Sequence, residues 1–330
     1  MARVVRFHEL GGPEVLRIDT VEVPAPGAGE LLIDVRALGL NRAEALFRAG
    51  QYLEQPTLPS RLGYEAAGIV RAVGPDVTGF SPGDAVSTIP GFSMSRYGVY
   101  GDAALVPAAI TVRHPEFLSF TQAAAVWMQY MTAYGALIDI AGLTAEDFVV
   151  VPAASSSVGI AAIQIARAVG ASVIATTRTG AKRAALHALG AHHVIATDEQ
   201  DVSAEILALT GNRGARVVFD PVAGPMVEKL AAATAQGGVI VLYGLLAMAP
   251  TPFPLMAALA KGLTLRGYTL FEIVSDPARL ERGKAYVIDE LAKGALNPII
   301  ARTFPIEEIV EAHRFMESNQ QIGKIVVTVG

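Results

Sequence analysis

The chain contains no cysteine among its 330 residues. Disulfide bridges, zinc sites built from thiolates and a catalytic cysteine are therefore excluded together. Charged residues are also scarce, at 17%, whereas hydrophobic residues make up 52% of the sequence. This balance is typical of a folded chain with a large buried core, and not of a disordered one.

Positive charge is not in excess, because the formal net charge is −5 at pH 7. Binding to nucleic acid depends on clustered positive charge, so we expect no nucleic acid as the main partner. The first residues, MARVVRFHELGGPEVL, contain no apolar signal-peptide region. We therefore expect a cytoplasmic protein.

One uncharged run, residues 230–260, is long enough to span a bilayer by length alone. Glycines at positions 237, 238 and 244 and prolines at 250, 252 and 254 interrupt it. A membrane-spanning helix needs its backbone hydrogen bonds closed along the whole run, which so many helix breakers prevent. We therefore predict a buried parallel strand followed by a loop, and no membrane contact.

The rhythm of the sequence changes near Thr121. Before it, short alternating runs such as 30–37 and turn signals such as SPGD predict a small β-barrel-like domain with few helices. After it, apolar strands alternate with helical patterns, which predicts an α/β fold with a doubly wound parallel sheet. We place the strands of that sheet near residues 148–152, 172–176, 193–195, 216–220, 238–243 and 263–268.

The length of the chain favours two domains over one. We predict a first domain formed by residues 1–121 and 295–330, and a dinucleotide-binding domain formed by residues 122–294. In the last segment we expect a helix over 306–318 and a final strand in IGKIVVTVG, which would return the chain to the first domain.

The stretch VVVPAASSSVGIAAIQIA, residues 149–166, predicts a strand, a turn of small residues and an amphipathic helix. In a G-x-G-x-x-G phosphate loop the three glycines would stand where this chain has Ala154, Ser156 and Gly159. Small side chains still permit close approach to a pyrophosphate, and serine can donate a hydrogen bond to it. An ordinary strand–turn–helix unit is the alternative. The candidate loop residues are Ala154, Ser155, Ser156, Ser157, Val158 and Gly159.

The next predicted strand ends at Thr177, 23 positions after Ala154. An acidic residue is expected about 20 positions on when the loop binds NADH. This chain instead has Thr177, Arg178, Thr179 and Lys182, and these two cations and two hydroxyls suit a 2′-phosphate. The pattern favours NADPH as the cofactor, with a solvated basic helix start as the alternative.

The chain resembles the medium-chain dehydrogenase/reductase superfamily. Within it, the resemblance is to the zinc-free quinone oxidoreductase branch, which includes zeta-crystallin-like proteins. The resemblance extends over nearly the whole chain. It is carried by GLNRAEALFRAGQY (39–52), PSRLGYEAAGIVRAVGPDVTGFSPGDAV (59–86), AAAVWMQYMTAYGAL (123–137), VVPAASSSVG (150–159), VVFDPVAG (217–224), GGVIVLYG (237–244) and GKIVVTV (323–329).

The resemblance implies a GroES-like β-barrel catalytic domain, a Rossmann domain and an active cleft between them. It also implies homodimers formed through edge strands of the Rossmann sheet, near residues 263–271. At positions matching the catalytic zinc ligands of the related alcohol dehydrogenases, this chain has Asn41, Tyr64 and Met128. These side chains do not form a usual zinc site, so we expect no metal.

Without a metal ion to lower the pKa of a hydroxyl, oxidation of a simple alcohol is difficult, and an acceptor that is already electrophilic needs less help. The resemblance implies four catalytic side chains. Asn41 and Tyr52 would look into the active cleft, Tyr64 would fill the place of the metal and donate a hydrogen bond, and Thr132 would lie beside the nicotinamide. The Asn41 and Thr132 side chains could equally be capping groups, and Tyr52 a partly buried aromatic. Tyr243 and Gly244 end a predicted strand at the carboxyl edge of the sheet, where cofactors bind. Lys324 stands where the family often has a lysine near the cleft, although it could be a surface charge.

We therefore predict an NADPH-dependent, zinc-independent oxidoreductase that transfers hydride to a quinone or to an α,β-unsaturated carbonyl. Two other enzymes remain open, an enoyl-thioester reductase and a zinc-type alcohol dehydrogenase. A third alternative is not an enzyme but an NADPH-binding structural or RNA-binding protein, which the net negative charge disfavours.

Overall fold

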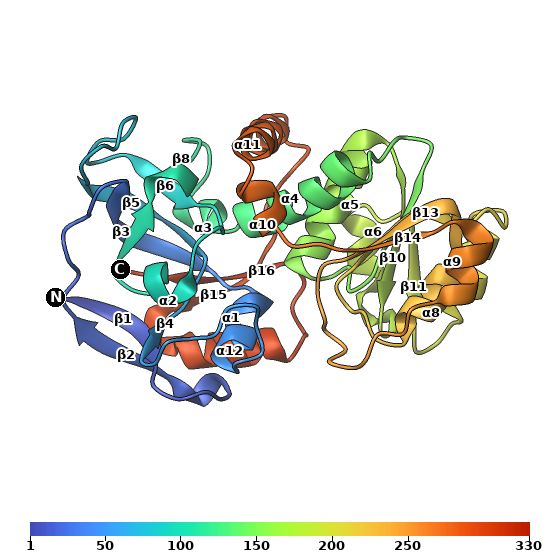
Figure 1. The fold of residues 1–330 in the computed structure, drawn as a ribbon, viewed down its shortest axis with the longest axis horizontal. Helices are drawn as coiled ribbons and strands as arrows, with labels where there is room; N and C mark the ends of the chain where they lie inside the picture. Colours follow the sequence, from blue (N-terminus) through green and yellow to red (C-terminus); the bar gives the residue numbers. More distant parts are fainter. The chain divides into compact units, whose positions relative to one another are not determined.

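The computed structural model describes all residues, Met1–Gly330, and the chain forms two compact units (Figure 1). Unit 1 consists of residues 1–128 and 298–330, and unit 2 of residues 129–297. The predicted domain boundaries followed residues 121 and 294. Both chain termini belong to unit 1.

Unit 1 is built mainly from antiparallel strands. One sheet has three strands in the order β2-β1-β4, and the other has seven, in the order β15-β16-β3-β5-β6-β8 with β7 paired to β3. Its strands are β1 (Ala2–Phe7), β2 (Leu16–Val21), β3 (Glu30–Gly39), β4 (Ser60–Arg61), β5 (Glu65–Val73), β6 (Ala85–Thr88), β7 (Ala103–Pro107), β8 (Thr111–Arg113), β15 (Ile300–Pro305) and β16 (Lys324–Thr328).

Few helices accompany these strands, as predicted for the first third of the chain. They are α1 (Arg42–Arg48), α2 (Met94–Tyr97), α3 (Phe120–Ala123) and α12 (Ile309–Glu317), with short 3-10 turns at Pro13–Val15, Ala108–Ile110 and Ile306–Glu308. The helix predicted over 306–318 is thus confirmed. The final strand is also confirmed, because β16 pairs with β15 and β3 inside unit 1.

Unit 2 contains a parallel six-stranded sheet in the order β11-β10-β9-β12-β13-β14. All six predicted strands are present, which confirms the doubly wound α/β fold. The strand order reverses between β9 and β12, and open sheets of this kind bind ligands at the carboxyl ends of the strands beside such a reversal. The strands are β9 (Phe148–Val151), β10 (Ser172–Thr177), β11 (His193–Ala196), β12 (Ala215–Asp220), β13 (Thr234–Leu242) and β14 (Thr264–Gly267).

Helices cover the faces of this sheet. One buried cluster joins Val150, Ile174 and Ile240 of the strands to Ile206 of α7 and Leu230 of α8. Because the strands are buried on both faces, their sequences are nearly continuous apolar runs. The helices are α4 (Trp127–Tyr134), a π-helix (Gly135–Ile140), α5 (Ser157–Val169), a 3-10 turn (Gly180–Lys182), α6 (Arg183–Ala188), α7 (Val202–Leu209), α8 (Met226–Ala232), α9 (Leu255–Lys261), α10 (Phe271–Val274) and α11 (Pro277–Ala292).

The uncharged run 230–260 contains the end of α8, strand β13, a loop and most of α9. The predicted strand and loop are therefore present, and a short helix follows them. None of the helices in the structure combines the length and the apolar character that crossing a membrane requires.

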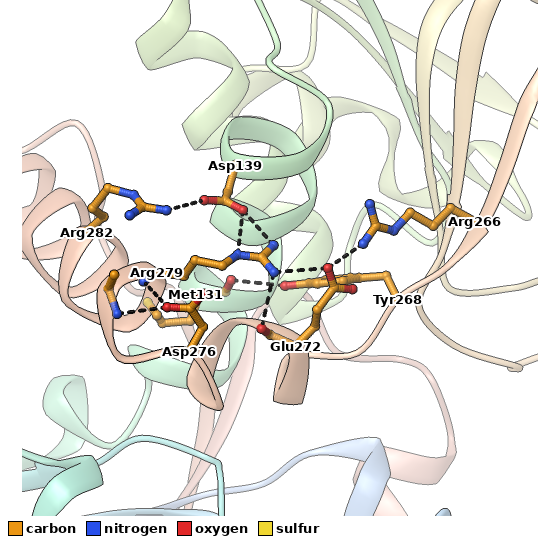
Figure 2. Close-up of polar contacts among 9 residues, drawn as sticks. Met131, Asp139, Arg266, Tyr268, Glu272, Asp276, Arg279 and Arg282 are labelled. Atoms are coloured by element: carbon orange, nitrogen blue, oxygen red, sulfur yellow. Dashed lines mark hydrogen bonds and ion pairs between the residues drawn. The ribbon is translucent and has the colours of Figure 1, made fainter.

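A network of charges joins the π-helix, α10, α11 and β14 (Figure 2). Arg279 of α11 donates to Asp139 of the π-helix at 2.9 Å and to Glu272 of α10 at 3.1 Å. Glu272 also pairs with Arg266 of β14, and Asp139 with Arg282 of α11. An isolated surface pair stabilises little, but this set of shared partners ties the outermost strand of the sheet to three helical segments.

Candidate active site

The predicted phosphate loop forms the turn between β9 and α5, at the carboxyl end of the sheet. The Ala154 N–H donates to the Thr176 carbonyl at 3.1 Å, which holds the turn against the end of β10. Ser156 is the N-cap of α5, and its hydroxyl oxygen accepts from the Gly159 N–H at 3.0 Å. It lies at the positive end of a 13-residue helix, where an anion is stabilised.

Gly159 is needed for the packing of α5 against this turn. A Cβ at this position would lie 2.7 Å from the Ala154 carbonyl oxygen, closer than real side chains approach. The two other positions that a phosphate loop fills with glycine are occupied by Ala154, which is completely buried, and by the capping Ser156. The loop therefore keeps the one glycine that the packing demands.

The predicted 2′-phosphate residues lie where β10 meets this loop. Thr177 is the last residue of β10, Arg178 is exposed, and Lys182 is half-buried. The Lys182 ammonium donates to the Ser155 hydroxyl at 3.0 Å, so the structure joins two of the predicted cofactor segments. Burial lowers the pKa of Lys182, and the neighbouring positive charge of Arg178 lowers it further. A bound anion would relieve this repulsion.

Glu199 is a member of this region that the sequence analysis did not identify. Its carboxylate accepts from the Gly180 N–H at 2.7 Å and lies 3.6 Å from the Arg183 guanidinium. The Asp198 N–H donates to the Arg178 carbonyl at 2.9 Å. The acidic pair in the sequence ATDEQ was a visible signal that the loop after β11 closes over the end of β10.

Tyr243 and Gly244 directly follow β13, as predicted. The Tyr243 ring stacks on Phe219 with 4.0 Å between centroids and 17° between planes, and burial raises the pKa of its hydroxyl well above the usual value. A Cβ at Gly244 would lie 2.7 Å from the Pro221 carbonyl oxygen. The backbone after β13 is therefore closely packed against the segment that follows β12, and the cofactor role of both residues stays a prediction.

In unit 1, Tyr52, Tyr64 and Phe92 form a cluster of rings, which we call the aromatic cluster. The Tyr52 and Tyr64 centroids lie 6.3 Å apart, and those of Tyr64 and Phe92 lie 5.6 Å apart. Tyr64 is buried, whereas Tyr52 is partly exposed at the margin of the cluster. Burial raises the pKa of Tyr52 to about 12. Its phenol therefore stays protonated at neutral pH and can act as a hydrogen-bond donor.

Glu54 holds the loop that carries Tyr52. Its carboxylate accepts from the Ser93 hydroxyl at 2.6 Å and from the Met94 N–H at 2.9 Å, at the start of α2. On the other side of Tyr52, the Gly50 N–H donates to the Phe47 carbonyl at 3.0 Å. The loop between α1 and β4 is thus held on both sides of Tyr52.

Asn41 begins α1 and is almost fully buried. Its amide nitrogen lies 3.2 Å from acceptors on Gly39, Glu44 and Glu65, and its amide oxygen accepts from the Lys324 ammonium at 2.5 Å. Both amide hydrogens therefore have acceptors within the chain. The role predicted for Asn41 toward a substrate stays a prediction, and the visible role is to join these groups.

Lys324 is fully buried and is not a surface charge. Its ammonium pairs with the Glu65 carboxylate, whose other oxygen accepts from the Met128 N–H at 2.9 Å. Its predicted contact with the cofactor stays a prediction. Thr132 lies in α4 and is buried, and its predicted place beside the nicotinamide likewise stays a prediction.

Asn41, Tyr64 and Met128, which the resemblance aligns with zinc ligands, do not fit a zinc ion. An amide, a phenol and a thioether are poor ligands for it, and the Asn41 amide oxygen already accepts from the Lys324 ammonium. A second cation beside a buried ammonium would also be repelled. Nowhere in the structure do three or more histidine, aspartate or glutamate side chains lie together in a way that could hold a metal ion.

Comparison with known proteins places the chain in a family. Residues 27–116 match the alcohol dehydrogenase GroES-like domain, and residues 157–282 match the zinc-binding dehydrogenases. The quinone oxidoreductase of Homo sapiens is 32% identical over 329 residues, which are 99% of this chain and 98% of that protein. The chain belongs to the quinone oxidoreductase branch of the medium-chain dehydrogenases/reductases.

Other members of the superfamily cover the same length. The 2-haloacrylate reductase of a Burkholderia species is 30% identical across 99% of this chain and 98% of its own. The crystal structure of the Escherichia coli quinone oxidoreductase complexed with NADPH has a TM-score of 0.90 and 28% identity, covering 99% of this chain and all of that one.

Membership of the quinone oxidoreductase branch confirms that the chain is an oxidoreductase with a GroES-like domain and a Rossmann domain. The family model named for zinc binding covers residues 157–282 and therefore none of the three positions that match zinc ligands. Glu44 and Glu65, which hold those positions together, were not identified from the sequence. The spacing Asn41-x-x-Glu44 was a visible signal, because it is the pattern of a capping box, which the structure contains.

Proposed function

We propose that this quinone oxidoreductase-branch protein uses NADPH to reduce a quinone or an α,β-unsaturated carbonyl without a metal ion. The observation that carries the proposal is that the positions matching zinc ligands hold an amide, a phenol and a thioether beside the aromatic cluster. Such a site cannot polarise an unactivated alcohol, whereas a flat electrophilic acceptor needs only placement and a hydrogen bond to its developing negative charge.

The loop from Ala154 to Gly159 would hold the pyrophosphate of NADPH at the start of α5. Arg178 and Lys182 would hold its 2′-phosphate, since they supply two cations at the end of β10. The cofactor, when bound, supplies the hydride. The relative whose structure contains NADPH supports this cofactor assignment.

Tyr52 would stabilise the negative charge that develops on the acceptor oxygen. Its phenol retains its proton at neutral pH, and its ring lies at the partly exposed margin of the aromatic cluster. A ring in that position can stack against a flat acceptor while the hydroxyl donates a hydrogen bond. Tyr64 and Phe92 would support the Tyr52 ring from the buried side.

A 2-haloacrylate reductase among the relatives favours a second acceptor class, the activated alkenes. An enoyl-thioester reductase, a zinc-type alcohol dehydrogenase and an NADPH-binding protein without activity are the other candidates. The first experiment is therefore to measure initial rates of NADPH and NADH oxidation, in the presence of a chelator, with 1,4-benzoquinone and with a 2-alkenal.

The same rates should be measured for Tyr52→Phe. We expect quinone reduction by the unmodified protein, and a kcat about 100-fold lower in the variant with an unchanged KM for NADPH, because only the developing charge loses its donor. Tyr286→Phe is the matched control, since Tyr286 is a half-buried tyrosine that packs on Tyr134 in unit 2. Turnover of the alkenal alone would reassign the acceptor. Activity that appears only with zinc and an alcohol would refute the proposal.

We also propose that the protein is a homodimer joined through β14. This strand is the last in the order of its sheet, so one of its edges carries unpaired backbone groups. Exposed apolar side chains are also concentrated in the segment between β13 and β14, and a monomer rarely leaves so much apolar surface uncovered. These side chains, which we call the apolar segment, are Leu245, Leu246, Met248, Phe253, Leu255, Met256 and Leu259.

Light scattering after gel filtration tests the dimer. We expect a mass of twice 34.5 kDa for the unmodified protein, and 34.5 kDa for Met256→Glu combined with Leu259→Glu, because the charges would be buried without partners. Phe117→Glu, at an exposed apolar residue of unit 1, should leave the dimer intact. A double variant that keeps the dimer mass would show that the apolar segment is not the interface.

A further inference from the structure

Four buried polar side chains of unit 1 form one closed network: Asn41, Glu44, Glu65 and Lys324. Each exposes 8% of its surface or less, and Glu44 exposes none. Lys324 pairs with Glu65 and donates to the Asn41 amide, and Asn41 in turn donates to both glutamates. We call these residues the Lys324 network.

Such a network is costly to bury. Removing an ammonium and two carboxyl groups from water carries a desolvation penalty that a single ion pair often fails to recover, and apolar residues of similar volume would frequently be as stable. Burial raises the pKa of Glu44 to about 7 even though the positive charge of Lys324 acts in the opposite direction. Stability alone is thus a weak reason for a lysine here, and its geometry points to another role.

The Lys324 network holds all three positions that match zinc ligands. The Asn41 amide belongs to it directly. The Tyr64 N–H donates to Glu44 at 3.2 Å, and the Met128 N–H donates to Glu65 at 2.9 Å. Three chain segments that are far apart in sequence, at the starts of α1, β5 and α4, therefore share one buried charge centre.

The backbone around Lys324 leaves space for its side chain. A Cβ at Gly39 would lie 2.8 Å from the Lys324 Cε and 2.0 Å from the Ala124 carbonyl oxygen, so only glycine fits between them. The Gly39 carbonyl also accepts from the Asn41 amide at 3.2 Å. The end of β3 is thus shaped to admit the lysine stem beside the network.

We propose that the Lys324 network, centred on the Lys324–Glu65 ion pair, positions the reduction site by fixing Asn41, Tyr64 and Met128 relative to one another. Lys324 is a positioning residue in this proposal, because it acts through Asn41 and Glu65. The proposal rests on the proposed function for its effect on turnover, but the fixing of the segments is testable without it.

Trp127 provides that independent test. It is the only tryptophan of the chain, it is buried, and its indole N–H donates to the Ser87 hydroxyl at 2.8 Å. It directly precedes Met128, whose N–H is held by Glu65. The fluorescence of the protein without cofactor therefore reports whether the start of α4 keeps its place.

The variants to compare are Lys324→Met, Glu65→Gln and the two combined. We expect Lys324→Met to lower the melting temperature strongly, because Glu65 is left buried without its cation. The combined variant should recover most of the melting temperature, yet keep a kcat at least 10-fold below normal with an unchanged KM for NADPH. The Trp127 emission of the combined variant should be shifted to the red relative to the unmodified protein. It should also be more readily quenched by acrylamide.

A combined variant with normal kcat and normal Trp127 emission would overturn the proposal, because the pair would then be merely structural. If the combined variant does not fold, Glu65→Gln decides on the same two readouts: it removes the ion pair with little change of volume, so a lower kcat and a red-shifted Trp127 emission are expected, and normal values of both would overturn the proposal. Arg48→Met combined with Glu317→Gln removes another ion pair of unit 1 and should change neither readout. If no acceptor is reduced at all, the proposed function fails, while the Trp127 result still tests the network.

Discussion

Replacing Arg178 and Lys182 together by alanine should raise the dissociation constant for NADPH roughly 100-fold while changing that for NADH less than about threefold. Each substitution removes a charge-assisted hydrogen bond to the 2′-phosphate, and such bonds contribute about 1.5–3 kcal/mol each. NADH has no such phosphate, so its binding should depend on the loop before α5 and not on these two side chains.

The structure explains why the pair should act together. Lys182 is held by the Ser155 hydroxyl at 3.0 Å, and its pKa is lowered by burial and by the positive charge of Arg178. Two cations that repel each other in the free protein are stabilised when an anion binds between them. The single variants should therefore each weaken NADPH binding by about 10-fold, and both losses should shrink at high salt.

Cofactor fluorescence measures both dissociation constants without any need for an acceptor. Lys293→Ala combined with Arg314→Ala is the control, because it changes the net charge equally at two exposed residues elsewhere. Equal losses for NADPH and NADH would show that Arg178 and Lys182 contact a part common to both cofactors, and the assignment of the 2′-phosphate would then be wrong.

The strands of the Rossmann half could be predicted because each is an apolar run buried on both faces. Val149 to Val151 and Val217 to Phe219 show this pattern directly in the sequence. The last strand could be predicted from the apolar run in IGKIVVTVG. The π-helix after α4 could not, because Gly135–Ile140 has no sequence feature that separates it from an α-helix.

The site was less predictable than the fold, because its decisive contacts join residues that are distant in sequence. Lys324 and Glu65 are 259 positions apart, and Lys182 and Ser155 are 27 apart. Local patterns show a residue's chemical type but not its partner. Lys324 could therefore be selected as a candidate from the sequence, whereas its burial and its carboxylate partner required the structure.

Replacing His313 by glutamine should remove a large pH-dependent part of the acid sensitivity of unit 1. His313 lies in α12 and is completely buried, and the Arg48 guanidinium lies 2.8 Å from its Nδ1. Because arginine can only donate, Nδ1 must accept, and the neutral imidazole carries its hydrogen on Nε2. The Tyr100 ring packs against it at 5.9 Å between centroids, and Glu317 pairs with Arg48 on the other side.

Burial and the positive charges of Arg48 and Arg42 lower the pKa of His313 to about 3 from its ordinary 6.5. Below pH 6.5 the unfolded chain therefore binds a proton at this histidine that the folded chain does not. The free energy of unfolding falls as the pH drops through this window, by about 1.4 kcal/mol per unit and roughly 5 kcal/mol by pH 3. Glu44 acts in the opposite direction, since its raised pKa adds stability as the pH falls from 7 toward 4.5.

Urea unfolding followed by Trp127 fluorescence between pH 4 and pH 8 measures this effect inside unit 1. His313→Gln should be less stable than the unmodified protein at pH 7, by about 1–3 kcal/mol, because a buried ring is lost. By pH 4 the free energy of unfolding of the variant, relative to that of the unmodified protein, should have risen by about 3 kcal/mol, since glutamine does not titrate. The contribution of Glu44 is common to both proteins and cancels.

Met316→Leu, a buried change on the same helix with no titratable group, should give a difference in the free energy of unfolding that does not vary with pH. A constant difference for His313→Gln as well would mean that the folded chain tolerates a charged imidazole beside Arg48.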